Sequence, residues 1–160
     1  DGENNKTEFK SSLRLCLKQK SAQDYIEHSS FKNVAAFLNT NGGTLLIGVE
    51  DDGNILGLEE TDYPTFKDSD KKDAFLKHMD NLIEKYLGNE YNGLIAVELE
   101  IVEGKTVAKV CMKNKSPEPA FLNIKEKGKP TKEAFYIRRS ASAKELSPSE
   151  TMKYFKANWS

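Results

Sequence analysis

Four acidic residues in the first third of the chain have the types and the spacing that bind a divalent cation. Glu3 and Glu8 stand five positions apart, and Asp51 and Asp52 follow the apolar run Thr44–Val49, which has the composition of a buried strand. Carboxylates are preferred ligands of Mg²⁺ and related hard cations, and a bound cation can polarise a phosphodiester oxygen. A second interpretation stays open, because most carboxylates on a protein surface are only solvated.

The positive charge of the chain is concentrated in residues 104–144. This stretch holds 11 Lys and Arg residues against 3 Asp and Glu, a net of +8, whereas residues 1–103 hold 11 against 20, a net of −9. Such a stretch predicts a surface for a polyanion such as RNA or DNA. The alternative is a pair of solvated, lysine-rich strands. The candidate nucleic-acid contacts are Lys113, Lys115, Lys125, Lys127, Lys129, Arg138 and Lys144.

Several other kinds of site are excluded by their own spacing rules. Gly104–Thr106 resembles the end of a phosphate-binding loop but lacks the glycine five positions earlier, so it is predicted to be a β-turn. Cys16 and Cys111 have neither the CxxC spacing of a zinc site nor the number of a disulfide scaffold, which favours a reducing, cytoplasmic compartment. His28 and His78 have no partner in the sequence pattern and are expected on the surface.

Apolar residues at helical spacing predict the helices that position these groups. Ser30 is a candidate N-cap of the second helix, and Gly42–Gly43 allow the left-handed backbone that a tight helix exit needs. The last helix starts with the capping sequence Ser147–Glu150 and is expected to bury Met152 and Trp159 among others. Four helices are predicted, covering about 10–19, 31–38, 75–87 and the stretch after 147.

Alternating apolar and polar residues predict a mixed sheet. Asp52-Gly53 is a hairpin signal, and Glu103-Gly104 forms the turn between the two longest strands. Because strands and helices do not alternate in regular βαβ order, the predicted fold class is α+β, a mixed sheet with three to four helices. The predicted strands cover 44–49, 55–58, 94–102, 105–112 and 134–138.

The length and composition predict one domain over residues 1–160. The 38% of apolar and 31% of charged residues are ordinary for a globular domain. No apolar run approaches the roughly 20 residues of a membrane span, so no membrane contact is expected within this segment. The chain begins at Asp1 without a methionine, which is compatible with excision from a longer protein.

Several motifs along the chain are jointly specific. They are Glu8-Phe9-Lys10, the run Ala35–Gly43 and the run Thr44–Gly57, followed by the proline-containing segment Ser116–Phe121 and by Phe135–Arg138. Together they resemble the Schlafen AlbA-like domain family, and the resemblance covers essentially the whole chain. It implies the fold of a Schlafen-type nuclease core with a single lobe.

The resemblance also implies a site. Schlafen proteins are metal-dependent endoribonucleases that act on transfer and ribosomal RNA, and their site uses two glutamates five residues apart and an aspartate at a strand end. These positions fall on Glu3, Glu8 and Asp51, which would be catalytic and would hold Mg²⁺ or Mn²⁺. The acidic neighbours of Asp51 remain alternatives for the third carboxylate. Lys10 matches the lysine of the family motif and is the fourth candidate catalytic residue.

Two functions remain open from the sequence. One is a Mg²⁺- or Mn²⁺-dependent endoribonuclease that acts on structured RNA such as tRNA. The other is a non-catalytic regulatory module that binds nucleic acid or a nucleotide such as ATP. The Schlafen nuclease core has two related lobes and a zinc-binding set of cysteines and histidines that this chain lacks. A homodimer would restore a two-lobed groove.

Overall fold

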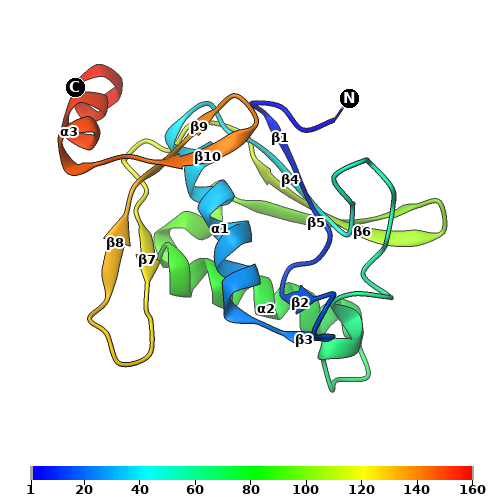
Figure 1. The fold of residues 1–160 in the computed structure, drawn as a ribbon. Helices are drawn as coiled ribbons and strands as arrows, with labels where there is room; N and C mark the ends of the chain where they lie inside the picture. The colour runs from blue at the N-terminus through cyan, green and yellow to red at the C-terminus, as the bar shows by residue number, and fades with distance from the viewer. Residues whose placement is uncertain (1, 160) are drawn as a thin grey trace.

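The computed structural model describes residues 2–159, which fold around a four-stranded mixed sheet (Figure 1). The strand order is β1-β4-β6-β5, in which β1 runs parallel to β4 and the other neighbours are antiparallel. A parallel pair needs a crossover connection, and a long helix provides it here. The strands are β1 (Thr7–Lys10), β4 (Gly43–Ile47), β5 (Ala96–Val102) and β6 (Lys105–Met112).

Two long helices, α1 (Asp24–Asn39) and α2 (Lys71–Tyr86), bury their apolar residues in one core with the sheet. α1 leaves the core by a tight turn in which the N–H of Gly42 donates to the carbonyl of Phe37 at 2.8 Å. Gly42 has a φ of +72°, and a Cβ there would lie 2.3 Å from the carbonyl oxygen of Met112. The turn therefore requires glycine, as the sequence predicts.

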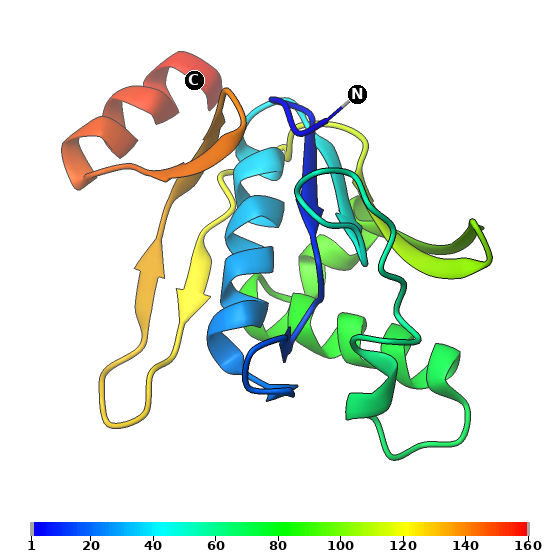
Figure 2. The same ribbon diagram turned by 45° about the vertical axis from the view of Figure 1, so that its right-hand side comes forward.

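Three hairpins and a C-terminal helix complete the fold. In both views α1 lies between β1 on one side and the β7–β8 hairpin on the other (Figure 1, Figure 2). In the described range 2–159, no helix has the length and apolar character that crossing a membrane requires. The remaining elements are β2 (Leu15–Cys16), β3 (Ser21–Ala22), β7 (Leu122–Ile124), β8 (Lys132–Ala134), β9 (Tyr136–Arg139), β10 (Ser142–Glu145), α3 (Pro148–Trp159) and the 3₁₀ turns Tyr63–Thr65 and Asn89–Leu94.

The α+β class is confirmed, but the prediction of a helix over 10–19 is wrong. This segment contains β1, a loop and β2. The buried carboxylate of Asp62 accepts the backbone N–H groups of Leu13, Arg14 and Leu15 at 2.6, 2.9 and 3.3 Å. These bonds hold the segment in a bent loop, so its apolar spacing reflects burial without a helix.

Three smaller predictions are also corrected. α1 begins at Asp24, so Ser30 is a buried residue inside the helix and not its N-cap. Met152 is 70% exposed, because α3 packs through Tyr154, Phe155 and Trp159 instead. The predicted strand over 55–58 is reduced to an isolated bridge between Val49 and Ile55.

Candidate functional site

β1 and the turn before it bring Glu3 and Glu8 into contact. Glu3 Oε2 accepts the backbone N–H of Phe9 at 3.0 Å, which folds the turn back along β1. Burial, and next the hydrogen bond between the two carboxyl groups, raises the pKa of Glu8 to about 7. The Glu8 carboxyl is therefore partly protonated at neutral pH, because it is buried and lies against a second carboxyl group.

Arg138 on β9 holds this pair from inside the protein. Its side chain is completely buried and lies 2.8 Å from Glu8 Oε1, whose own side chain is 12% exposed. The guanidinium also donates to Asn33 Oδ1 at 2.8 Å and to the carbonyls of Asn4 and Thr7 at 2.8 and 3.1 Å. Arg138 thus joins the N-terminal turn, β1 and α1 at the candidate site. Its positive charge suggested an exposed contact with nucleic acid, but the side chain is buried.

Lys10 lies on β1, two residues after Glu8, and is held by a hydroxyl group of α1. Its Nζ donates to Ser29 Oγ of α1 at 2.8 Å. Burial, the largest cause, lowers the pKa of Lys10, whereas the charges of Glu8, Glu3 and Asp51 oppose this shift. All three predicted acidic residues therefore lie close enough to act on the same ammonium group.

The third carboxylate does not join the pair. Asp51 and Asp52 are exposed in the turn after β4, where Asp52 Oδ1 accepts the N–H of Asn54 at 2.9 Å, and Glu50 is half-buried. Within residues 2–159, no three His, Cys, Asp or Glu side chains are arranged to hold a metal ion. The structure thus assembles the pair Glu3–Glu8 beside Lys10 but no three-carboxylate group.

A surface hollow of about 260 Å³ opens beside Lys10. Ser11, Ser29 and Lys18 line it together with the apolar residues Leu15, Leu17 and Ile26, and the Ser12 hydroxyl at its wall already donates to the carbonyl of Leu15. We call it the Lys10 hollow. Hydroxyl and ammonium donors of this kind suit a phosphate group.

The predicted nucleic-acid contacts lie in separate places. Lys113 follows β6 and is exposed, whereas Lys115 donates to the carbonyl of Asn158 at 2.9 Å and so supports α3. Lys144 on β10 lies 4.0 Å from Glu150. The largest group is on the β7–β8 hairpin and comprises Lys125, Lys127 and Lys129.

Sequence reasoning missed several polar contacts of the site. The contacts of Arg138 with Glu8 and Asn33 join residues far apart in the chain, and no local spacing signals them. His78 Nε2 lies 2.6 Å from Glu27 Oε2, so this histidine has a partner after all. No sequence signal indicated this contact, because Glu27 lies in the first turn of α1, before the helix predicted from residue 31.

Comparisons with known proteins agree with this fold. The family described as "Schlafen, AlbA_2" matches residues 3–147. The crystal structure of the DIP2311 protein from Corynebacterium diphtheriae is similar with a TM-score of 0.60 and 19% sequence identity, over 98% of this chain and 28% of that chain. This likeness concerns the fold, and the present chain spans little more than a quarter of that protein's length. A search of curated proteins finds no significant match.

Proposed function

The chain belongs to the Schlafen AlbA_2 family, and on that premise we propose that it is a nucleic-acid-processing domain that cleaves phosphodiester bonds of structured RNA such as tRNA. The observation that carries the proposal is the contact of Glu3 with Glu8 beside Lys10. Of these three residues only Lys10 lines the Lys10 hollow, and the two carboxylates lie next to it on β1 and the preceding turn. Two carboxylates and an ammonium group can together position a phosphate and a water molecule for hydrolysis.

The glutamate pair fits a Mg²⁺ or Mn²⁺ ion of the kind that uses few protein ligands. Magnesium is commonly bound through one or two carboxylates together with water and the phosphate of the substrate, so a third carboxylate is not required. Glu3 and Glu8 would hold the ion, with Asp51 positioned to approach it only through water. A bound cation would stabilise the charge that develops on the phosphate and lower the pKa of a water molecule.

The chain's own residues have distinct roles in this proposal. Arg138 and the N–H of Phe9 fix the orientation of the two carboxylates. Lys10, held by Ser29, faces the phosphate side of the site and compensates its negative charge. Burial lowers the pKa of Lys10 because water solvates its ammonium group poorly. For the same reason, the attraction between this ammonium group and a neighbouring phosphate would be stronger than in bulk water.

A second function, RNA binding without cleavage, is favoured by one observation. Arg138 already neutralises Glu8, and the described residues 2–159 contain no group of three metal-binding side chains. In that case the glutamates would have a structural role, and the hairpin lysines would provide the affinity for RNA.

Incubation of labelled tRNA with the protein separates these functions. Cleavage with Mn²⁺ that stops with EDTA, disappears in Glu3→Gln and Lys10→Met, and persists in the exposed control Glu98→Gln supports the nuclease. RNA that is retarded in a gel but uncut, with or without Mn²⁺, supports the binding module. RNA that is neither retarded nor cut would rule out both functions.

A further inference from the structure

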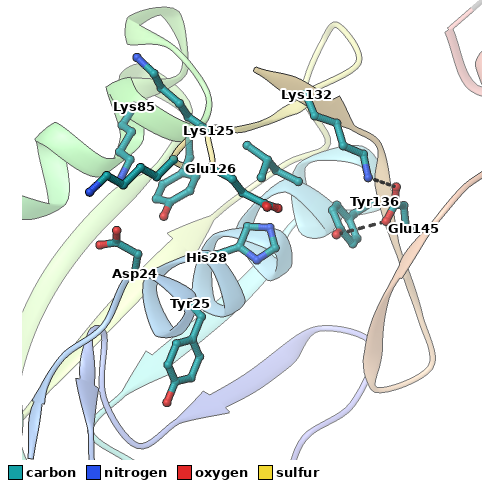
Figure 3. A pocket seen from close by; sticks show the side chains of 12 residues that line it. Asp24, Tyr25, His28, Lys85, Lys125, Glu126, Lys132, Tyr136 and Glu145 are labelled. Atoms are coloured by element: carbon teal, nitrogen blue, oxygen red, sulfur yellow. Dashed lines mark hydrogen bonds and ion pairs between the residues drawn. The ribbon is translucent and has the colours of Figure 1, made fainter. Parts of the chain in front are cut away.

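A second, larger hollow lies on the opposite side of α1 from β1. It has a volume of about 480 Å³ and is bordered by α1, the end of α2, the β7–β8 hairpin and the β9–β10 hairpin (Figure 3). This size is within the range of small-molecule sites. We call it the hairpin hollow.

Aromatic rings form much of the wall of the hairpin hollow. Tyr86 is buried and stacks on Phe31, with ring centroids 5.2 Å apart and an interplanar angle of 17°, so its ring is fixed. Tyr136 is also buried, whereas Tyr25 is 55% exposed and its ring extends from α1 away from His28 and Glu126 (Figure 3). Lys85 Nζ lies 5.0 Å from the centre of the Tyr86 ring, so a nucleobase that stacks on this ring would take the place of the ammonium group. Fixed aromatic rings suit the flat face of a nucleobase, because stacking on them needs little ordering of the protein.

Polar groups of the hairpin hollow are left without partners. His28 Nε2 is a buried atom that has no hydrogen-bond partner within residues 2–159, and Figure 3 shows its ring extending from α1 toward Glu126. A buried imidazole nitrogen without a partner is unusual and points to a group that the hollow would receive. Burial lowers the pKa of His28 and so favours the neutral ring, which has one N–H donor and one acceptor nitrogen for a base.

The charges around the hairpin hollow favour an anion. Its carboxylates Glu145 and Glu126 are paired, with Lys132 at 3.8 Å and with Lys129 at 3.1 Å. Three other lysines that line the hollow take part in no ion pair within residues 2–159. Asp24 is the one lining carboxylate in this range that is likewise outside every ion pair. The three lysines are Lys85, Lys125 and Lys127.

The first turns of α1 connect the two hollows. Tyr25 borders the hairpin hollow, and its hydroxyl donates at 3.1 Å to the sulfur of Cys16, which lines the Lys10 hollow. The charge of Lys32 acts on both Lys10 and His28. An anionic strand that crosses these turns would therefore meet both hollows.

We propose that the hairpin hollow binds one nucleoside phosphate, with its base against Tyr86, Tyr136 and His28 and its phosphate at Lys125 and Lys127. The inference rests on the proposed function in one respect, because it takes the nucleotide to be part of a single-stranded RNA segment that continues to the Lys10 hollow. A free mononucleotide has the same chemistry, and the experiment distinguishes these two sources.

Proton NMR of the two histidines provides the test. The chain has two histidines, and their Cε1–H signals are assigned with the variant His28→Gln. The probes are ribose 5-phosphate, adenosine monophosphate and a ten-nucleotide oligouridylate. We expect the latter two to shift the His28 signal while that of His78, held by Glu27, moves little, and we expect ribose 5-phosphate to have a much weaker effect because it lacks a base.

Binding of the same RNA to surface variants provides the second readout. Tyr25→Leu removes an exposed ring and is expected to weaken binding by about tenfold. Lys127→Gln is expected to weaken it by about threefold. Lys153→Gln, the same charge change on α3 outside the hollow, is the matched control, and circular dichroism checks that all variants fold.

The outcomes distinguish failure of the hollow from failure of the proposed function. RNA binding that weakens in both variants, with a shift at His28, supports the hollow as an RNA subsite. A response to adenosine monophosphate without RNA binding supports the hollow and rules out the RNA function. RNA binding that leaves His28 unshifted and both variants equal to the control overturns the hollow alone. No response to any probe overturns both proposals.

Discussion

Removal of the buried guanidinium at the candidate site is expected to have a cost that depends on pH. Arg138→Met keeps much of the side-chain volume but leaves Glu8 without its cation. Removing one partner of a buried ion pair typically costs about 3–5 kcal/mol, because the other charge remains buried and unpaired. This cost applies where Glu8 is ionised, which is above pH 7, since the pKa of Glu8 is raised to about 7.

The sign of the pH dependence follows from that raised pKa. A carboxyl group whose pKa is higher in the folded state than in the unfolded state binds its proton more tightly when folded, so its protonation stabilises the protein. For the wild-type chain, this stability is present below pH 4.5 and is lost as the pH rises through about 7. At pH 5 Glu8 is protonated, and Arg138→Met should cost only the hydrogen bonds to Asn33, Asn4 and Thr7, about 1–3 kcal/mol.

Urea unfolding at pH 8 and pH 5 measures both free energies. The variants are Arg138→Met, Glu8→Gln and the double variant, which should be destabilised by about 1–3 kcal/mol less than the sum of the single changes at pH 8. An equal cost of Arg138→Met at the two pH values, or strict additivity at pH 8, would refute the assignment of Glu8 as the partner that titrates.

Four further outcomes are expected. Gly43→Val should lower the free energy of unfolding by about 1–3 kcal/mol in urea titration, because a Cβ there would lie 2.4 Å from the ring of Phe37. Asp62→Ala should lower it by about 3 kcal/mol or more, since three backbone N–H groups lose a charged acceptor. Affinity for Mn²⁺, measured by calorimetry, should fall about tenfold from pH 8 to pH 6 as a proton competes at Glu8. The slope of log K for RNA against log salt should flatten by about two units, for all sequences alike, when three hairpin lysines become glutamine: Lys125, Lys127 and Lys129.

The sequence predicts the parts of this fold in which one element buries a regular apolar face. α2 was expected over 75–87 and occupies Lys71–Tyr86, because most of its apolar residues lie on one face that is buried in the core. The antiparallel pair β5–β6 also follows from alternation and a two-residue turn. The contact of Glu3 with Glu8 was accessible through their five-residue spacing, since the turn before β1 folds the chain back on itself.

Other features depend on contacts between distant segments. No local pattern in the 10–19 segment shows that Asp62 will hold its backbone in a loop. The net charge of residues 104–144 likewise does not show which side chains are buried and which are exposed. Arg138 is buried against Glu8, whereas the lysines of the β7–β8 hairpin are exposed to solvent. A charge count therefore predicts an amount of positive surface but does not say which residues form it.

The error at the start of α1 is informative about function. The helix was expected from residue 31 because apolar periodicity begins there, yet it starts at Asp24. Its first turns lack an apolar face because they extend past the sheet, and Tyr25, Ser29 and Lys32 follow one another at the spacing of a helix face. These side chains border the two hollows or act on the groups within them. Where a helix continues without burying apolar residues, its side chains are available for a ligand. The turns of α1 before residue 31, which the sequence did not predict, therefore carry groups that both proposals require.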